Sequence, residues 1–231
     1  MGIKVRMGMW VFLSISLLSS GHVLALPTTW VDWTSAGSGP SATSTGSANG
    51  VTVSFTGDIY FTQAGGGVNY WSVSPSTYTQ PPAVDNPPPS SDIIALTGGP
   101  GTGIQTLTFS TPVVNPVMAL LSVGAPGTAV TYDFSVPFNV LNTGPGYWGS
   151  GFLASLPGDL LLGEEGHGLI LFPGTFTSIS WINPTGEAWH GFTVGLPGSA
   201  APVPEPSTLL LLGSGLLCLV PRVRRLMRTD E

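Results

Sequence analysis

The sequence has few charged residues, and its positive charges are confined to its two ends. Only 8% of the 231 residues are Asp, Glu, Lys or Arg. Between Arg6 and Arg222 there is no lysine or arginine. Contacts to nucleic-acid phosphates depend on these basic side chains, so no binding to nucleic acid is expected of this stretch. It also lacks Lys or Arg salt bridges, and its stability must come from apolar burial and backbone hydrogen bonds.

Cysteine and histidine are scarce too. The single cysteine, Cys218, lies in the C-terminal region, which excludes internal disulfides and cysteine-based zinc sites from the rest of the chain. No nucleophile elbow, phosphate loop or zincin helix occurs in the sequence. The glycine-rich residues 97–103 lack the lysine of a phosphate loop and are expected to form a loop between strands. We therefore predict a protein that is not an enzyme and has no cofactor.

Apart from the adjacent Glu164 and Glu165, acidic residues occur singly along the same stretch, without EF-hand spacing. Asp side chains and carbonyl oxygens hold Ca²⁺ in many exported β-sandwiches. A calcium site in this stretch is therefore the alternative to a domain that binds no metal. Unpaired acids repel one another, which predicts that stability rises with added salt and from neutral pH to about pH 5. Between Leu26 and Pro204 there are nine acids: Asp32, Asp58, Asp85, Asp92, Asp133, Asp159, Glu164, Glu165 and Glu187.

The N-terminus has the layout of a secretory signal peptide. Lys4 and Arg6 precede an apolar stretch at residues 10–18. Val23-Leu24-Ala25 then fits a cleavage site with small residues at its first and third positions. We predict a signal helix in residues 1–25, with cleavage after Ala25 and export of the chain beyond it.

The C-terminal region contains an apolar run that is short for a membrane span. Sixteen uncharged residues separate Glu205 from Arg222. As a helix they would cover about 24 Å of a hydrocarbon core about 30 Å thick. The basic residues Arg222, Arg224 and Arg225 follow, and such flanks stay on the cytoplasmic side. The pattern predicts a short transmembrane helix stopped by these arginines.

The order of Pro204-Glu205-Pro206, a Leu/Gly-rich apolar run and arginines resembles the PEP-CTERM sorting signal. The resemblance implies that these three residues are the motif recognised by exosortase, a protease-transpeptidase in the inner membrane of Gram-negative bacteria. It implies transient anchoring there, followed by release to the cell surface or beyond. Such a segment is also labelled an ice-binding protein C-terminal domain, after some proteins that carry it.

Between these ends, the composition favours β structure. Glycine and proline are abundant, at 32 and 22 residues, while Thr, Ser, Val and Phe recur in short alternating runs. We predict one all-β domain at residues 26–196, a linker at 197–202 and a sorting and membrane segment at 203–228. The favoured fold is an antiparallel β-sandwich of the jelly-roll type, with a β-barrel as the alternative.

Period-two alternation and turn residues give the expected elements. Residues 35–50 and the proline-rich residues 76–92 are predicted to be loops. Strands are predicted at residues 51–55, 58–61, 70–73, 105–109, 117–123, 130–140, 169–172, 175–182 and 189–196.

Two histidines remain as candidates for chemistry. His190 shares parity with Phe192 in its strand, which favours a structural role in the core. His167 lies in the stretch GEEGHG, where the glycines favour an exposed hairpin turn, although metal binding or general-base chemistry is the alternative. A hydrolase would need two carboxyl groups on one pocket, with a histidine nearby, and the candidate acids are Glu164, Glu165 and Glu187.

Aromatic residues suggest a second class of function. Their default role is in the core, but exposed coplanar tryptophans would indicate stacking on carbohydrate. The leading hypothesis is a non-enzymatic surface or extracellular-matrix protein, with extracellular polysaccharide as a candidate partner. A glycan-binding module, with or without Ca²⁺, is the alternative, and a glycan hydrolase or an ice-binding protein is less favoured. The aromatic candidates are Trp30, Trp33, Tyr70, Trp71, Tyr147, Trp148, Trp181 and Trp189.

Overall fold

The computed structural model describes residues 27–198 of the chain. Within this range, no helix has the length and apolar character needed to cross a bilayer. The predicted signal helix, transmembrane helix and sorting motif fall outside the described residues, as do their key positions Ala25, Pro204, Glu205, Pro206, Arg222, Arg224 and Arg225.

The regular secondary structure of the described residues is almost entirely β-strand, and the strand pairs are antiparallel. The first half contains β1 (Thr28–Trp30), β2 (Asp32–Trp33), β3 (Gly39–Ala48), β4 (Val51–Gln63), two short 3₁₀ helices, η1 (Tyr70–Ser72) and η2 (Pro75–Tyr78), β5 (Ile93–Leu96) and β6 (Gln105–Val114). The second half contains β7 (Val117–Val123), β8 (Val130–Phe134), β9 (Asn139–Thr143), β10 (Pro145–Gly146), β11 (Gly149–Ser150), β12 (Phe152–Leu156), β13 (Leu160–Glu164), β14 (Gly166–Leu171), β15 (Thr175–Ile182) and β16 (His190–Pro197).

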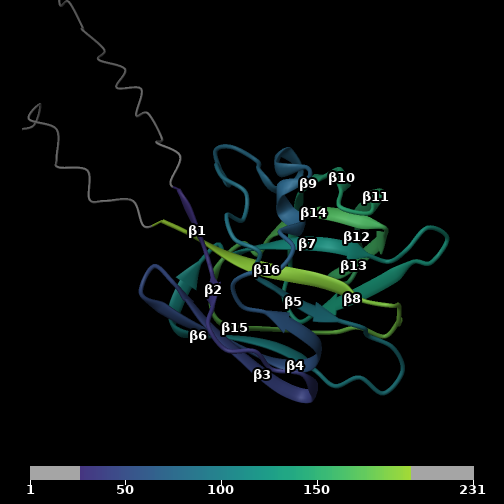
Figure 1. Ribbon diagram of the computed structural model, residues 1–231, viewed down its shortest axis with the longest axis horizontal. Coiled ribbons are helices and arrows are strands. Elements are labelled where there is room, and N and C mark those ends of the chain that lie inside the picture. Colours follow the sequence, from purple (N-terminus) through teal and green to yellow (C-terminus); the bar gives the residue numbers. More distant parts are fainter. Residues whose placement is uncertain (1–26, 199–231) are drawn as a thin grey trace, which may run out of the picture.

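Hydrogen bonds join most strands into one large sheet in the order β12-β13-β8-β15-β6-β4-β5-β16-β7-β14-β9. The sheet curls so that β9, β14, β7 and β16 face β15, β6 and β4 across the core (Figure 1). Its two end strands approach each other, and the Leu153 N–H of β12 donates to Thr143 Oγ1 of β9 at 3.2 Å. The predicted antiparallel all-β class is confirmed, while the strands form one nearly closed, barrel-like sheet instead of two separate ones.

The strands on one side of this sheet are buried on both faces. In β7, Met118 and Leu120 point into the main core, whereas Ala119 and Leu121 belong to a second apolar cluster. Residues 64–92, with η1 and η2, cover this second cluster, where Trp71 and Tyr78 are fully buried. This explains why β7 is a continuous apolar run instead of an alternating one.

The chain enters and leaves the domain at the same place. β1 pairs with β16, so that Thr28 lies opposite Pro197. The Gly198 N–H then donates to the Pro27 carbonyl at 3.0 Å. This pairing fixes the final strand against the first residues of the described chain.

Several sequence predictions of local structure were wrong. Residues 35–50, predicted as a loop, contain β3, which pairs along most of its length with β4. Ser and Thr on its outer face conceal the alternation, because they are polar but strand-forming. Residues 70–73 were predicted as a strand, but Tyr70–Ser72 form η1, which is capped by the Asn69 side chain accepting from the Trp71 N–H.

The third error concerns residues 130–140, predicted as one long strand. The strand β8 ends at Phe134, and β9 begins at Asn139. β8 pairs with β13 and β15, whereas β9 pairs with β14. The parity of apolar residues continues through Pro137 because Phe134 of β8 and Phe138, just before β9, reach the same core.

Candidate functional site

Six aromatic side chains form a continuous band on the protein, here called the aromatic strip. Neighbouring ring centroids are 5.0 Å apart for Tyr147 and Trp148, 4.8 Å for Trp148 and Trp189, and 5.0 Å for Trp189 and Phe61. Tyr60 extends the strip, with its ring 5.8 Å from that of Phe61. The members of the strip are Tyr60, Phe61, Tyr70, Tyr147, Trp148 and Trp189.

The strip is partly open to solvent. Tyr60, Trp148 and Tyr147 are 58%, 45% and 40% exposed. The other three rings are partly buried against the second apolar cluster, which fixes the base of the strip. Burial raises the pKa of Tyr70, with a smaller contribution from the nearby Tyr147. Its hydroxyl is therefore a neutral hydrogen-bonding group at physiological pH.

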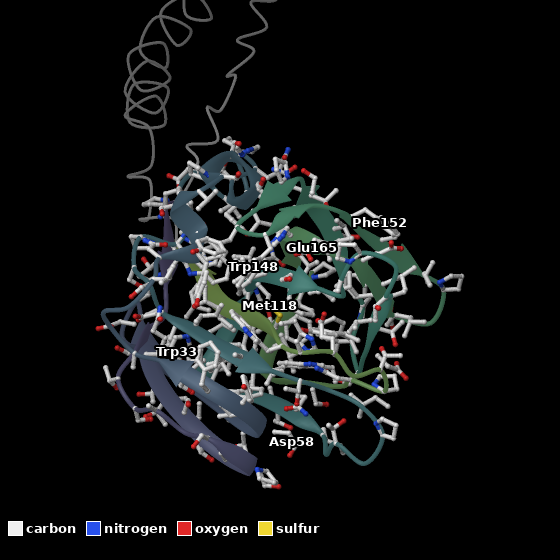
Figure 2. The ribbon with its side chains drawn as sticks, turned by 45° about the vertical axis from the view of Figure 1, so that its right-hand side comes forward. Trp33, Asp58, Met118, Trp148, Phe152 and Glu165 are labelled. Atoms are coloured by element: carbon white, nitrogen blue, oxygen red, sulfur yellow. The ribbon has the colours of Figure 1, made fainter. Side chains whose placement is uncertain are left out.

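A short hairpin carries the most prominent part of the strip. β10 and β11 pair so that Tyr147 and Trp148 form the two-residue turn between them. The ring of Tyr70, which comes from η1, lies 4.9 Å from that of Tyr147 and 5.3 Å from that of Trp148. Segments distant in sequence thus build one surface, and Trp148 lies on the side that also carries Glu165 (Figure 2).

The rings are stepped and not coplanar. The planes of Trp148 and Trp189 are at 85°, and those of Tyr70 and Trp148 at 31°. The flat tryptophan platform considered from the sequence is therefore not formed. Because neighbouring rings are tilted against one another, each ring presents its own apolar face, and these faces follow one another along the strip.

The other aromatic candidates have structural roles. Trp71 is fully buried, and its Nε1 donates to the Asp92 carbonyl at 3.1 Å. Trp33 Nε1 donates to Thr193 Oγ1 at 3.2 Å. Trp30 and Trp181 are buried as well. Sequence reasoning missed Tyr60 and Phe61 as members of the strip, because no local signal separates them from ordinary strand residues.

His167 is buried in a polar cluster beneath the hairpin. The Ser122 N–H donates to His167 Nδ1 at 3.1 Å, which makes Nε2 the protonated nitrogen of a neutral ring. Nε2 lies 3.1 Å from Glu165 Oε1 but without an aligned hydrogen bond. Burial lowers the pKa of His167, although Glu165 opposes this shift. The predicted exposed hairpin turn was wrong, because β13 and β14 on either side of Glu165 pair with different strands.

His190 is buried in the core, as predicted from the alternation of residues in its strand. Its Nδ1 is 2.6 Å from Glu187 Oε1, and its Nε2 is 2.9 Å from Asn183 Nδ2. The ring also packs against Tyr132, with centroids 5.1 Å apart. Both ring nitrogens are occupied by protein groups, which is the arrangement of a structural histidine.

The three glutamates considered for catalysis all accept hydrogen bonds from residues 122–127, at the end of β7 and just after it. Glu165 Oε1 accepts from Ser122 Oγ at 2.7 Å, and Glu187 Oε1 accepts from the Gly124 N–H at 2.9 Å. Glu164 Oε1 accepts from the Gly127 N–H, also at 2.9 Å. Because the Ser122 hydroxyl is bonded to Glu165, it is not paired with His167 as a nucleophile with its base.

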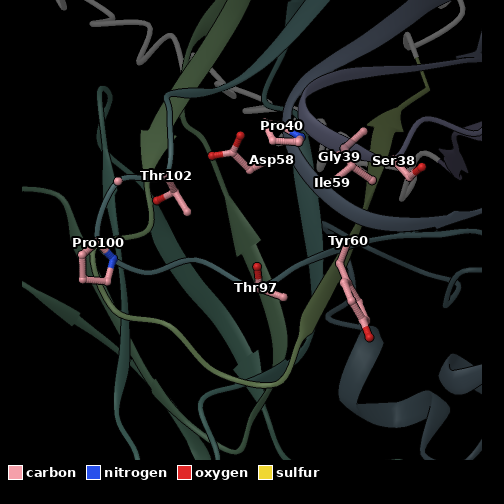
Figure 3. Close-up of a pocket in the computed structure, with 10 residues that line it drawn as sticks. Ser38, Gly39, Pro40, Asp58, Ile59, Tyr60, Thr97, Pro100 and Thr102 are labelled. Carbon is pink, nitrogen blue, oxygen red and sulfur yellow. The ribbon is translucent and has the colours of Figure 1, made fainter.

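The described residues contain no group of three or more His, Cys, Asp or Glu side chains positioned to hold a metal ion. They do form an open pocket of about 530 Å³ between the β3–β4 side and the glycine-rich loop 97–103. Figure 3 shows Asp58 between Pro40 and Thr102, with Tyr60 at one end of the pocket. The three glutamates do not line it.

Comparison with known proteins identifies the C-terminal segment. Residues 202–225 match the family model of the PEP-CTERM protein-sorting motif, which confirms the resemblance seen in the sequence. A search of curated proteins and a search of solved structures gave no match. The motif implies an exported protein that exosortase recognises and that is sorted towards the cell surface from a membrane-anchored state.

Proposed function

We propose that this chain, which carries the PEP-CTERM protein-sorting motif, is a non-enzymatic protein of the cell surface or extracellular matrix. The motif at residues 202–225 is the observation that carries the proposal. The two histidines and the three glutamates considered for catalysis support it, since they serve as hydrogen-bond partners of backbone and core groups.

Processing in a host that has exosortase tests the sorting step. The wild-type protein should be exported and lose its C-terminal tail. Replacement of Pro204, Glu205 and Pro206 by alanine should leave it in the inner membrane, while replacement of Ser207 and Thr208 serves as the matched control. Retention of the intact wild-type chain in the cytoplasm would contradict the proposal.

The aromatic strip favours a second function, the binding of a neutral polysaccharide. Sugar rings present apolar C–H faces that pack on aromatic rings, and exposed aromatic side chains bury large areas on binding. Between Arg6 and Arg222 the chain has no lysine or arginine to pair with an acidic polymer. A neutral glycan is therefore the partner that this surface suits, and its stepped rings suit a single chain better than a flat crystalline face.

Trp148→Ala tests this function directly. The substitution removes the central exposed ring and should weaken binding to neutral glycans about tenfold. Phe152→Ala is the matched control, because Phe152 is 43% exposed but lies on β12, outside the strip. A glycan array probed with and without chelator also tests the calcium alternative. Equal binding by both variants and the wild type would exclude the strip as the binding surface.

A further inference from the structure

The pocket beside Asp58 is continuous with the aromatic strip. Tyr60 lines the pocket and also forms the end of the strip, next to Phe61. Figure 3 shows the Tyr60 ring at the end of the pocket away from Pro100 and Thr102. A ligand that lies along the rings from Trp148 therefore reaches the pocket without leaving the protein surface.

The walls of the pocket are held in place by one carboxylate. Asp58 Oδ1 accepts from the Ser41 N–H at 3.1 Å on one wall, and Oδ2 accepts from the Gly103 N–H at 2.5 Å on the other. The Asp58 N–H donates to Oε1 of Gln105, a residue that is 1% exposed. The pocket is thus fixed by hydrogen bonds to the buried sheet instead of depending on a ligand to order it.

The chemistry of the lining suits a polyhydroxylated, uncharged group. The lining combines one aromatic ring, that of Tyr60, with the hydroxyl-bearing Ser38, Thr97 and Thr102 and with the Asp58 carboxylate. A carboxylate accepts hydrogen bonds from sugar hydroxyls and repels anions. The volume of about 530 Å³ lies within the usual range of ligand pockets, about 300–1,000 Å³.

We propose that this pocket is a second subsite for the same neutral glycan chain that stacks on the aromatic strip. This inference rests on the proposed glycan binding. It adds that one sugar unit occupies the Asp58 pocket while neighbouring units of the chain lie on the rings. Affinity should therefore rise with chain length until an oligosaccharide spans both the strip and the pocket.

The test uses the full-length protein in a zwitterionic detergent, which carries no sugar headgroup to compete. Calorimetry with neutral glucan, mannan and galactan oligosaccharides, from disaccharide to hexasaccharide, gives affinity against chain length. The wild type should bind the longest oligosaccharides about tenfold more tightly than the short ones. Tyr60→Ala should abolish most of this gain with chain length, whereas Tyr60→Phe should retain it.

A second variant guards against misfolding of the first. Thr97→Val removes one hydroxyl of the pocket at nearly constant volume and should reduce the gain with chain length by a few-fold. Trp148→Ala should instead weaken binding at every length. If Tyr60→Ala and Thr97→Val leave the length dependence intact while Trp148→Ala weakens binding, the pocket is not a subsite, although the strip still binds glycan. If no oligosaccharide binds, the proposed glycan binding is itself wrong.

Discussion

Gly146 lies directly against the imidazole ring of His167. A Cβ atom at Gly146 would come within 2.2 Å of His167 Cγ, far closer than atoms can pack. The hairpin that presents Tyr147 and Trp148 is therefore seated on a buried histidine, and only glycine allows this approach.

Gly146→Ala should displace this hairpin. We expect the free energy of unfolding to fall by about 1–3 kcal/mol through overpacking. Binding to neutral glycans should fall several-fold, because Tyr147 and Trp148 move with the hairpin. Urea unfolding and a glycan-binding assay measure the two effects. Ser150→Ala, at an exposed position of the same hairpin, is the control, and equal glycan binding by both variants would argue against the hairpin's role.

Acidification should destabilise the domain through His167. Burial keeps its folded-state pKa below the ordinary value of about 6.5, which applies to the unfolded chain. Below pH 6.5 the unfolded state therefore binds a proton that the folded state does not, and stability falls as pH decreases. Repulsion among the acidic side chains would have the opposite effect, because it would make stability rise as pH decreases.

Thermal melts between pH 7.5 and pH 5 separate these two effects. His167→Gln removes the titrating group, so the loss of stability on acidification should be smaller in this variant than in the wild type. A wild-type domain whose melting temperature rises steadily towards pH 5 would show that repulsion among the acids outweighs His167.

Asp92 should be a major contributor to stability. Its carboxylate is buried and accepts the Trp33 N–H at 2.9 Å and the Gly65 N–H at 2.8 Å. Asp92→Asn offers an N–H₂ group where one of these donors needs an acceptor, which should cost about 1–3 kcal/mol. Urea unfolding measures the loss. The control is Asp133→Asn, at an exposed position of β8, and a similar loss in both variants would contradict this role.

Glu187 should serve the fold and not glycan binding. It joins the Gly124 N–H to His190 in the core. Both donors bind Oε1, so Glu187→Gln replaces a charged acceptor by a neutral amide oxygen. Because hydrogen bonds to a charged group are the stronger ones, we expect a loss of about 1–3 kcal/mol in unfolding free energy. Glycan affinity measured well below the melting temperature should stay unchanged. If the folded Glu187→Gln variant bound glycan more weakly than the wild type, Glu187 would instead belong to a functional site.

The sequence by itself determined the sorting motif and the fold class. The motif is read from the order of Pro204-Glu205-Pro206, apolar run and arginines, which needs no tertiary contact. Strands such as Val117–Val123 and Thr175–Ile182 were predicted with their observed bounds, because they have strong local propensity and clear flanking turns. The core position of His190 likewise followed from strand parity, which is a local property.

Only the tertiary structure decided what the remaining residues do. Phe61, Tyr70, Trp148 and Trp189 come from four separate segments, and their proximity depends on how the sheet curls and where η1 lies. The burial of His167 depends on a hairpin closing over it, whereas its glycine-rich neighbours are typical of an exposed turn. Periodicity reports which face of a strand a residue occupies, but strand order decides what covers that face, and this order is set by pairing between residues far apart in the chain.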